Sequence, residues 1–367
     1  MKQKLNLKTK TSSIKNTQAP PPPAFDPSET VSAEFGIFGL PFTEETAQII
    51  LLPVPWEVTT SYGKGASDGP RMIRNASEQI DLFDFETKKA YEVGYFMRDF
   101  PKQLKKKNDL NKKKAQKIIE LRTSRSSNQK LIQKLTDEVN AACSEMTEWV
   151  YQNTKDILKK NKKFGLVGGD HSTPLGAIKA FCEHYKSDFG ILHIDAHADL
   201  RNAYQGFQQS HASIMNNVMS LPKPPRKLVQ VGIRDFSEEE FEFSNSRKDI
   251  KTFYDLQLKQ QLQKGKSWSQ LCSEIIAELP DKVYISFDID GLDPVLCPNT
   301  GTPVPGGLTT DQIFYLFHTL NESGKKLVGF DLNEVSSGGN KLIEAEWDGN
   351  VGARMLYKLC GWLALSK

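Results

Sequence analysis

The stretch Gly190–Arg201, GILHIDAHADLR, begins as an apolar run and ends in charged side chains. A short apolar run of this kind is typical of a strand that helices cover on both faces of its sheet. Asp195, His197 and Asp199 follow at every second position, so in extended backbone their side chains point the same way. Buried carboxylates that lie together are costly unless they are neutralised, and a divalent cation is the usual partner. The stretch therefore predicts a core strand that ends at a metal site, whereas a polar loop is the alternative for this fragment taken alone.

The rest of the chain repeats the strand pattern. Five more apolar runs are IILLPVPW (49–56), FGLVGG (164–169), KLVQVGIR (227–234), VYISFDID (283–290) and LVGFDLNEV (327–335). Helical or loop-length segments separate these runs, and apolar positions at helical spacing predict a long amphipathic helix from about Asn128 to about Asn161. This alternation predicts one α/β domain with a mainly parallel, doubly wound sheet.

Ligand-type side chains stand at the ends of four of the predicted strands. These side chains are Asp170 and His171, then Asp195, His197 and Asp199, then Asp288 and Asp290, and finally Glu334. In an open parallel sheet, ligands bind beyond the carboxyl ends of the strands. We therefore expect the four ends to form one site, because chance polarity of four separate loops does not readily explain the pattern.

Four motifs carry a resemblance to a known family. GGDHS (168–172), DAHADLR (195–201), SFDIDGLDP (286–294) and GTPVPGGLT (301–309) resemble the signature blocks of the ureohydrolase family of arginases and agmatinases, in the family's order. The resemblance extends from about Ile49 to Leu363. It implies a binuclear manganese hydrolase with a three-layer α/β/α sandwich, assembled as trimers or hexamers, and it makes residues 34–367 the ureohydrolase domain.

The resemblance also implies the metal ligands. His171, Asp195, Asp199 and Asp288 match the family's first metal site. His197 and Asp290, together with the bridging Asp195 and Asp288, match the second. Four carboxylates balance the charge of two divalent ions, and an oxygen-rich set with two imidazoles suits Mn²⁺ better than a thiolate-seeking metal. Ni²⁺ or another ion stays possible, because ligand type ranks divalent metals only loosely.

Three residues are expected to act on the substrate. Glu334 has no basic partner in its motif, and a carboxylate accepts two hydrogen bonds from a guanidinium in fork geometry. The matching glutamate of the family holds the guanidinium of the substrate. His211, in QQSHAS, matches the family's proton shuttle, with Asp290 as the expected relay. We interpret His193, by contrast, as a packed or supporting residue.

The hydrolase class is easier to predict than the substrate. Arginases carry an asparagine where this chain has Arg201, and an acidic residue where it has Ser237. Both differences weigh against L-arginine and favour the agmatinase-like branch. Because Arg201 is able to pair with a substrate carboxylate, a guanidino acid such as guanidinobutyrate is the alternative, together with free guanidine.

Three other classes of protein compete with this prediction. A metal-dependent deacetylase of related architecture does not require both His171 and the Asp288–Asp290 pair. A binding protein that only keeps the fold should show a broken ligand set, which this chain does not. A nucleic-acid-associated protein would act through residues 98–134, where thirteen Lys or Arg stand against three acids and give a net charge of +10. After Phe100 that segment has no aromatic residue among its basic residues, and it has no nucleic-acid motif, so we expect a solvated, Lys-rich insertion away from the chemistry.

The remaining sequence features concern the ends and the compartment. Residues 1–33 contain a proline run and few large apolar side chains, which predicts a flexible N-terminal arm. No window approaches the roughly 18 apolar residues of a membrane span, and the N-terminus lacks the apolar core of a secretory signal. The five cysteines are scattered and include no CxxC pair, which fits reduced thiols. We therefore expect a cytoplasmic protein with a small guanidino substrate as its partner and no membrane contact.

Overall fold

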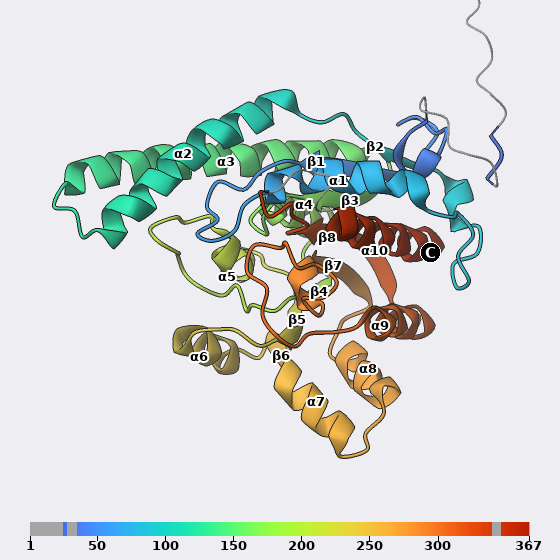
Figure 1. Ribbon diagram of the computed structural model, residues 1–367. Coiled ribbons are helices and arrows are strands. Elements are labelled where there is room, and N and C mark those ends of the chain that lie inside the picture. Colours follow the sequence, from blue (N-terminus) through green and yellow to red (C-terminus); the bar gives the residue numbers. More distant parts are fainter. Residues whose placement is uncertain (1–24, 28–34, 340–345, 367) are drawn as a thin grey trace, which may run out of the picture.

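A sheet of eight parallel strands organises the protein (Figure 1). The computed structural model describes residues 25–27, 35–339 and 346–366. The strands lie in the order β2-β1-β3-β8-β7-β4-β5-β6, and every neighbouring pair is parallel. Their bounds are Ile49–Val54 (β1), Tyr95–Met97 (β2), Lys163–Gly168 (β3), Gly190–Ile194 (β4), Lys227–Ile233 (β5), Ile250–Tyr254 (β6), Lys282–Asp288 (β7) and Lys326–Asn333 (β8).

Helices cover both faces of the sheet. Their bounds are Gly69–Ala76 (α1), Lys102–Thr123 (α2), Gln129–Lys159 (α3), Leu175–His184 (α4), Ile214–Met219 (α5), Glu238–Ser246 (α6), Asp255–Gln263 (α7), Trp268–Ala277 (α8), Thr310–Glu322 (α9) and Glu346–Leu365 (α10). One hydrophobic core lies between the sheet and α3, α4 and α5, and the other between the sheet and α1, α8, α9 and α10. Leu166 and Val167 of β3 enter opposite cores, as the alternation of side chains along a strand requires. The three-layer sandwich with a doubly wound parallel sheet is therefore confirmed.

The sequence pattern found the six inner strands and missed the two at the edges. β2 has only three residues, and Ile250 is the one fully buried residue of β6. An edge strand does not need the continuous apolar run that reveals a strand buried on both faces. The expected helix near 128–161 is present as α3, Gln129–Lys159.

The basic segment 98–134 is more ordered than predicted. Most of it forms α2, which runs beside α3 (Figure 1). Leu104, Ala115 and Ile118 of α2 are buried in the core that α3 shares. Two ion pairs, Lys107–Glu145 at 2.5 Å and Lys114–Glu138 at 2.8 Å, join the helices on the outside. The expectation of a solvated insertion is therefore wrong for this helix, because one of its faces packs against the protein.

Most of the predicted N-terminal arm lies outside the described residues. Of the three that are described, Phe25 packs edge-on against Phe35 with ring centroids 6.1 Å apart. No helix in the described part of the chain is both long and apolar enough to cross a membrane.

Truncating a side chain in the middle of the sheet should destabilise the protein. Leu166 is fully buried in β3, whereas Leu110 on α2 is 58% exposed. We expect Leu166→Ala to lower the free energy of unfolding by about 2–5 kcal/mol, because it leaves a cavity that the sheet cannot close. Leu110→Ala removes the same atoms from the surface and should change it by less than about 0.5 kcal/mol. Urea denaturation of both variants checks this, and equal effects would contradict the assigned core.

Candidate metal centre and substrate pocket

The predicted site residues converge because their strands are neighbours. β3, β8, β7 and β4 are adjacent in the centre of the sheet, and all four run in the same direction. Their carboxyl ends therefore meet at one edge, which brings together side chains as far apart in sequence as His171 and Glu334. The backbone N–H of His171 donates a hydrogen bond to Glu334 Oε1 at 3.0 Å.

The first ligand group surrounds one imidazole nitrogen. His171 Nδ1 lies 2.9 Å from Asp195 Oδ2, 3.1 Å from Asp288 Oδ2 and 3.3 Å from Asp199 Oδ2. All four side chains are buried. His193 lies beside this group, with its Nε2 2.8 Å from Asp195 Oδ2.

The second ligand group lies around His197. His197 Nδ1 is 3.1 Å from Asp290 Oδ2 and 3.5 Å from Asp195 Oδ1. Asp195 thus presents one oxygen to each group, as a bridging ligand must. Asp288 presents Oδ2 to the first group, while its Oδ1 accepts a hydrogen bond from the backbone N–H of Asp290 at 2.9 Å. The bridging role of Asp288 stays a prediction.

The donor set fits divalent cations. Burial, with the charge of Asp195 as a second cause, raises the pKa of Asp199 to about 7. Burial and the neighbouring carboxylates also raise the pKa of Asp288 well above its ordinary range. Such shifts measure the cost of holding several negative charges together, and two hard cations with oxygen and imidazole ligands would remove that cost. These residues therefore fit two metal ions, which share Asp195.

A buried hydrogen-bond chain fixes which nitrogen of His171 faces the carboxylates. Ser286 Oγ donates to Asp331 Oδ1 at 2.9 Å, and His171 Nε2 lies 3.0 Å from Ser286 Oγ. Because the single hydroxyl proton goes to Asp331, Ser286 must accept from Nε2–H. In the neutral imidazole the proton therefore lies on Nε2, and Nδ1 is the nitrogen that would bind a cation.

The sequence analysis missed these supporting residues. Ser286 and Asp331 each stand two positions before a polar strand-end residue, Asp288 and Asn333, inside runs that are otherwise apolar. That period of two was the available signal, because it places them on the same face of the strand as the site. A similar arrangement supports His193, whose Nδ1 accepts a hydrogen bond from Gln230 Nε2 at 3.0 Å.

Glu334 is a buried carboxylate in strained backbone. Its φ is +63°, which is uncommon for a residue other than glycine, and its N–H donates to Gly169 O at 2.8 Å. Burial, and secondly the charge of Asp170, raises the pKa of Glu334 well above its ordinary range. Within the described ranges, no Lys or Arg lies in ion-pair distance of its carboxylate. The side chain is thus suited to a cation that comes from outside the protein.

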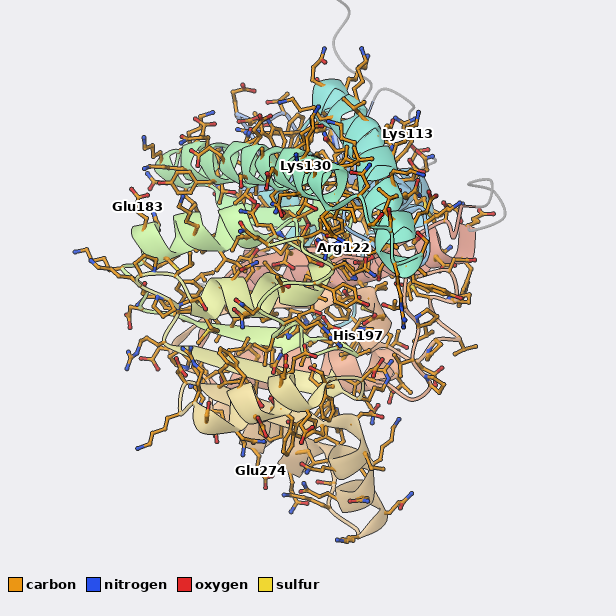
Figure 2. The ribbon with its side chains drawn as sticks, turned by 90° about the vertical axis from the view of Figure 1, so that its left-hand side faces the viewer. Lys113, Arg122, Lys130, Glu183, His197 and Glu274 are labelled. Atoms are coloured by element: carbon orange, nitrogen blue, oxygen red, sulfur yellow. The ribbon has the colours of Figure 1, made fainter. Side chains whose placement is uncertain are left out.

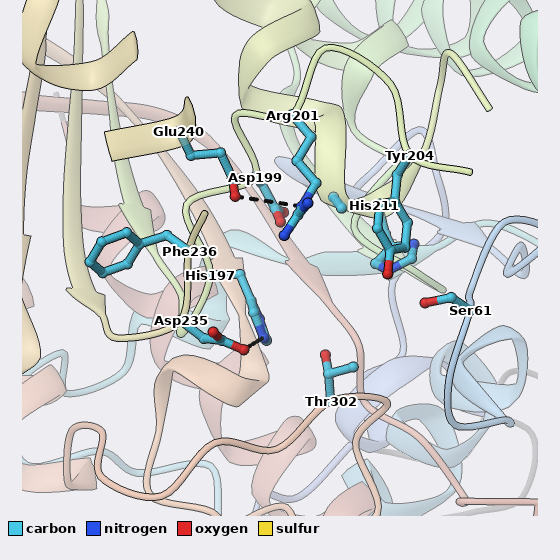
Figure 3. A pocket seen from close by; sticks show the side chains of 11 residues that line it. Ser61, His197, Asp199, Arg201, Tyr204, His211, Asp235, Phe236, Glu240 and Thr302 are labelled. Carbon is cyan, nitrogen blue, oxygen red and sulfur yellow. Dashed lines mark ion pairs between the residues drawn. The ribbon is translucent and has the colours of Figure 1, made fainter. Parts of the chain in front are cut away.

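A pocket of about 140 Å³ opens beside His197 (Figure 3). It is lined by Ser61, His197, Asp199, Arg201, Tyr204, His211, Ala212, Asp235, Phe236, Glu240 and Thr302. The pocket thus joins the second ligand group to His211, the predicted proton shuttle. Burial lowers the pKa of His211 to about 4, so its imidazole is neutral near pH 7.

The two residues that weighed against arginine have different places. Arg201 lines the pocket, with its Nε 3.5 Å from Glu240 Oε2 and its guanidinium 5.1 Å from the Tyr204 ring centre (Figure 3). Ser237 caps the N-terminus of α6 in a reciprocal arrangement with Glu240. Ser237 therefore acts on helix α6, whereas Arg201 faces the place where a substrate would lie.

The basic segment also reaches this region. Lys112 of α2 lies 2.7 Å from Glu57 Oε1, and Asn108 Oδ1 accepts a hydrogen bond from the Glu57 N–H at 2.7 Å. Glu57 begins the segment that contains the pocket residue Ser61. α2 thus contacts a segment that forms the pocket wall, but no residue of 98–134 lines the pocket itself, and the expectation that this segment is not needed for the chemistry stays a prediction.

Comparison with known proteins agrees with this geometry. The sequence profile described as "Arginase family" matches residues 47–341. The chain belongs to the arginase family. This membership does not favour the deacetylase, binding-protein and nucleic-acid alternatives.

Several named relatives of this arginase-family chain are ureohydrolases. It is 30% identical over 320 residues to N(1)-aminopropylagmatine ureohydrolase of Thermococcus kodakarensis, covering 86% of this chain and 89% of that protein. It is 27% identical over 319 residues to the protein of the same name from Synechocystis sp., with the same coverage. The crystal structure of agmatine ureohydrolase of Thermoplasma volcanium has the same fold, with a TM-score of 0.65, 22% identity, and coverage of 88% of this chain and 92% of that one.

The shared position of Asp195 predicts that one substitution weakens both metal sites. The unsubstituted protein should bind two divalent ions per chain, and its melting temperature should rise with Mn²⁺ concentration, because only the folded state holds the ligands together. Asp195→Asn should lower the affinity for both ions by about tenfold or more. Asp188→Asn, a surface control, should bind metal normally. Metal analysis and thermal unfolding check this, and loss of only one ion from Asp195→Asn would contradict the shared ligand.

Proposed function

We propose that this protein hydrolyses a guanidino C–N bond of a small substrate and releases urea and an amine, as an agmatinase-like ureohydrolase. The observation that carries the proposal is Glu334, a buried carboxylate without a cationic partner among the described residues, beside two ligand groups that share Asp195. A guanidinium supplies the missing charge, and its planar fork of N–H groups matches a carboxylate. Family membership and the names of the relatives support the same reaction class.

Each site residue has a role in this proposal. His171, Asp195, Asp199, Asp288, His197 and Asp290 hold two divalent ions. When bound, such ions act as Lewis acids and lower the pKa of water towards neutrality.

The chain's own side chains orient the substrate and move its proton. Glu334 binds the guanidinium and holds its carbon beside the ligand groups. His211 is neutral near pH 7, so it can take up a proton at a ring nitrogen and deliver it to the departing amine. Asp290 is the proposed relay, with its Oδ1 held by the backbone N–H of Ala196 at 3.1 Å.

The charges of the pocket favour a substrate with a cationic tail. Outside the proposed metal ligands, the pocket contains one cation, Arg201, and two carboxylates, Asp235 and Glu240. Arg201 forms an ion pair with Glu240, and the side chain of Asp235 is 68% exposed at the opening of the pocket. This balance supports a guanidino amine such as agmatine. A guanidino acid stays the second candidate, because Arg201 is 39% exposed and faces the pocket.

The metal, assembly and compartment complete the proposal. We propose Mn²⁺ as the metal, since the ligands are oxygen and imidazole, with Ni²⁺ as the alternative. We also propose a trimer or hexamer, as the family resemblance implies. A cytoplasmic location agrees with five free cysteines, all buried.

Removing the charge of Glu334 should abolish most of the activity and leave the metals in place. We expect Glu334→Gln to lower kcat/KM roughly 30- to 150-fold, because a charge-assisted contact is lost. This factor corresponds to about 2–3 kcal/mol of transition-state stabilisation. Glu322→Gln, an exposed control at the end of α9, should leave the rate unchanged. Steady-state urea release and metal content test this. An unaltered rate in Glu334→Gln would sink the assignment of Glu334.

The substrate assignment is tested by urea release from agmatine, guanidinobutyrate, guanidinopropionate, guanidine and L-arginine with Mn²⁺- or Ni²⁺-loaded protein. All five offer the same guanidinium and differ in the charge of the tail. We expect agmatine to be preferred, with L-arginine about a hundredfold lower in kcat/KM, because one misplaced charge costs on the order of 2–4 kcal/mol. Preference for guanidinobutyrate would establish Arg201 as a carboxylate ligand. Failure of every substrate with two metals bound would reject the guanidino assignment.

A further inference from the structure

The side chain of one lysine of the basic helix α2 points into the protein. Lys112 Nζ lies 2.7 Å from Glu57 Oε1, and the two side chains are only 13% and 8% exposed. The next residue, Lys113, is exposed on the outer side of α2 (Figure 2). A buried ammonium and carboxylate stabilise one another, and removing one partner leaves the other as an uncompensated buried charge. Lys112 therefore differs in physical role from its neighbours in the same charged run.

Glu57 fixes the segment that follows it. Its Oε2 accepts a hydrogen bond from the Gly65 N–H at 2.8 Å, and its Oε1 accepts one from Ser67 Oγ at 3.1 Å. One side chain thus closes the 57–67 segment into a loop, with backbone and side-chain donors from its far end. Lys105, one more residue of α2, donates to Ser67 Oγ at 2.9 Å. Helix α2 consequently holds both ends of this loop.

The loop held by Glu57 forms a wall of the site. Ser61 lines the pocket, and Gly63 packs so closely that an added Cβ would lie 2.6 Å from Gly301 Cα. Lys64 O accepts a hydrogen bond from Ser336 Oγ at 2.7 Å, two residues after Glu334. A displacement of the loop would therefore be felt at the carboxylate that is proposed to hold the guanidinium.

The C-terminal end of α2 contacts a second loop that lines the pocket. Arg122 lies at the end of α2 nearer to His197 (Figure 2), and an added Cβ at Gly206 would lie 2.4 Å from its Nη2. Gly206 belongs to the loop that carries Tyr204 and His211 into the pocket. The helix thus touches two of the loops that line the pocket.

We propose that Lys112 is a positioning residue: its ammonium holds Glu57 in place, and Glu57 holds the 57–67 loop against Gly301 and Glu334. The expected change in KM rests on the proposed function. The order of the 57–67 loop does not, because it can be measured without a substrate. Without the ammonium, the Glu57 carboxylate turns towards water and releases its contacts to Gly65 and Ser67. The pocket wall loosens, and the guanidinium is held less well.

The test compares Lys112→Met with Lys113→Met in the full-length, Mn²⁺-loaded protein. Both variants remove one positive charge from adjacent positions of α2, so they share any general electrostatic effect. We expect Lys112→Met to increase amide hydrogen exchange of the 57–67 peptide about tenfold or more and to raise KM for agmatine by a similar factor, with two metals retained. Lys113→Met should stay within about twofold of the unsubstituted protein in both measurements. Unchanged exchange and KM in folded Lys112→Met would overturn the proposal.

Further variants separate positioning from a folding defect or a metal defect. Lys112→Arg keeps the charge and should restore most of the exchange protection and KM. If Lys112→Met does not fold, the double variant Glu57→Gln/Lys112→Met removes both charges of this buried ion pair, and it should still show the loosened loop. Unchanged amide hydrogen exchange of the 57–67 loop in the double variant would reject positioning through Glu57. So would a loss of bound metal in Lys112→Met that parallels the rise in KM. If no guanidino substrate is hydrolysed by the unsubstituted protein, the proposed function fails, and hydrogen exchange alone decides the role of Lys112.

Discussion

The repulsion among carboxylates gathered at one sheet edge is the constraint on which this structure depends. Asp195, Asp199, Asp288 and Asp290 reach the same place because β4 and β7 are parallel neighbours. Burial raises the pKa of Asp199 to about 7, so holding its negative charge here near neutral pH without a cation costs stability. Asp288 and Asp290 each have one carboxylate oxygen held by a backbone N–H group, so that the other oxygen faces a site histidine.

The residues that contact the histidines of the site from inside the sheet fix the positions of the imidazole protons. Ser286 and Asp331 determine the proton position on His171, and Gln230 does the same for His193. These contacts lie inside β7, β8 and β5, where the backbone is already fixed by the sheet. Rigid strands thus set the protonation of the site, while loops supply the residues that meet a substrate, such as Arg201 and His211.

Much of this arrangement could be predicted from the sequence, for physical reasons that also mark the limit. Inner strands are apolar on both faces and so leave a continuous signal, and the period-two acids of 195–199 point to one site. The edge strands β2 and β6 leave no such signal. The sequence also did not show that the side chain of Lys112 points into the protein, because a run of lysines has the same sequence pattern whether a side chain faces water or a buried acid. Only the fold brings Glu57 opposite it, over 50 positions away in the chain.

The strand order also determines when the site can exist during synthesis. β3 and β4 follow one another along the chain, yet they are separated in the sheet by β8 and β7, which come last. A growing chain that ends before residue 280 holds His171, Asp195 and Asp199 without the strands that should lie between them. The two halves of the sheet are joined only when β7 and β8, from the last quarter of the chain, take their places between β3 and β4. A chain truncated before β7 carries Asp195 and Asp199 but lacks Asp288 and Asp290, so the complete set of proposed metal ligands exists only once nearly the whole chain has been made.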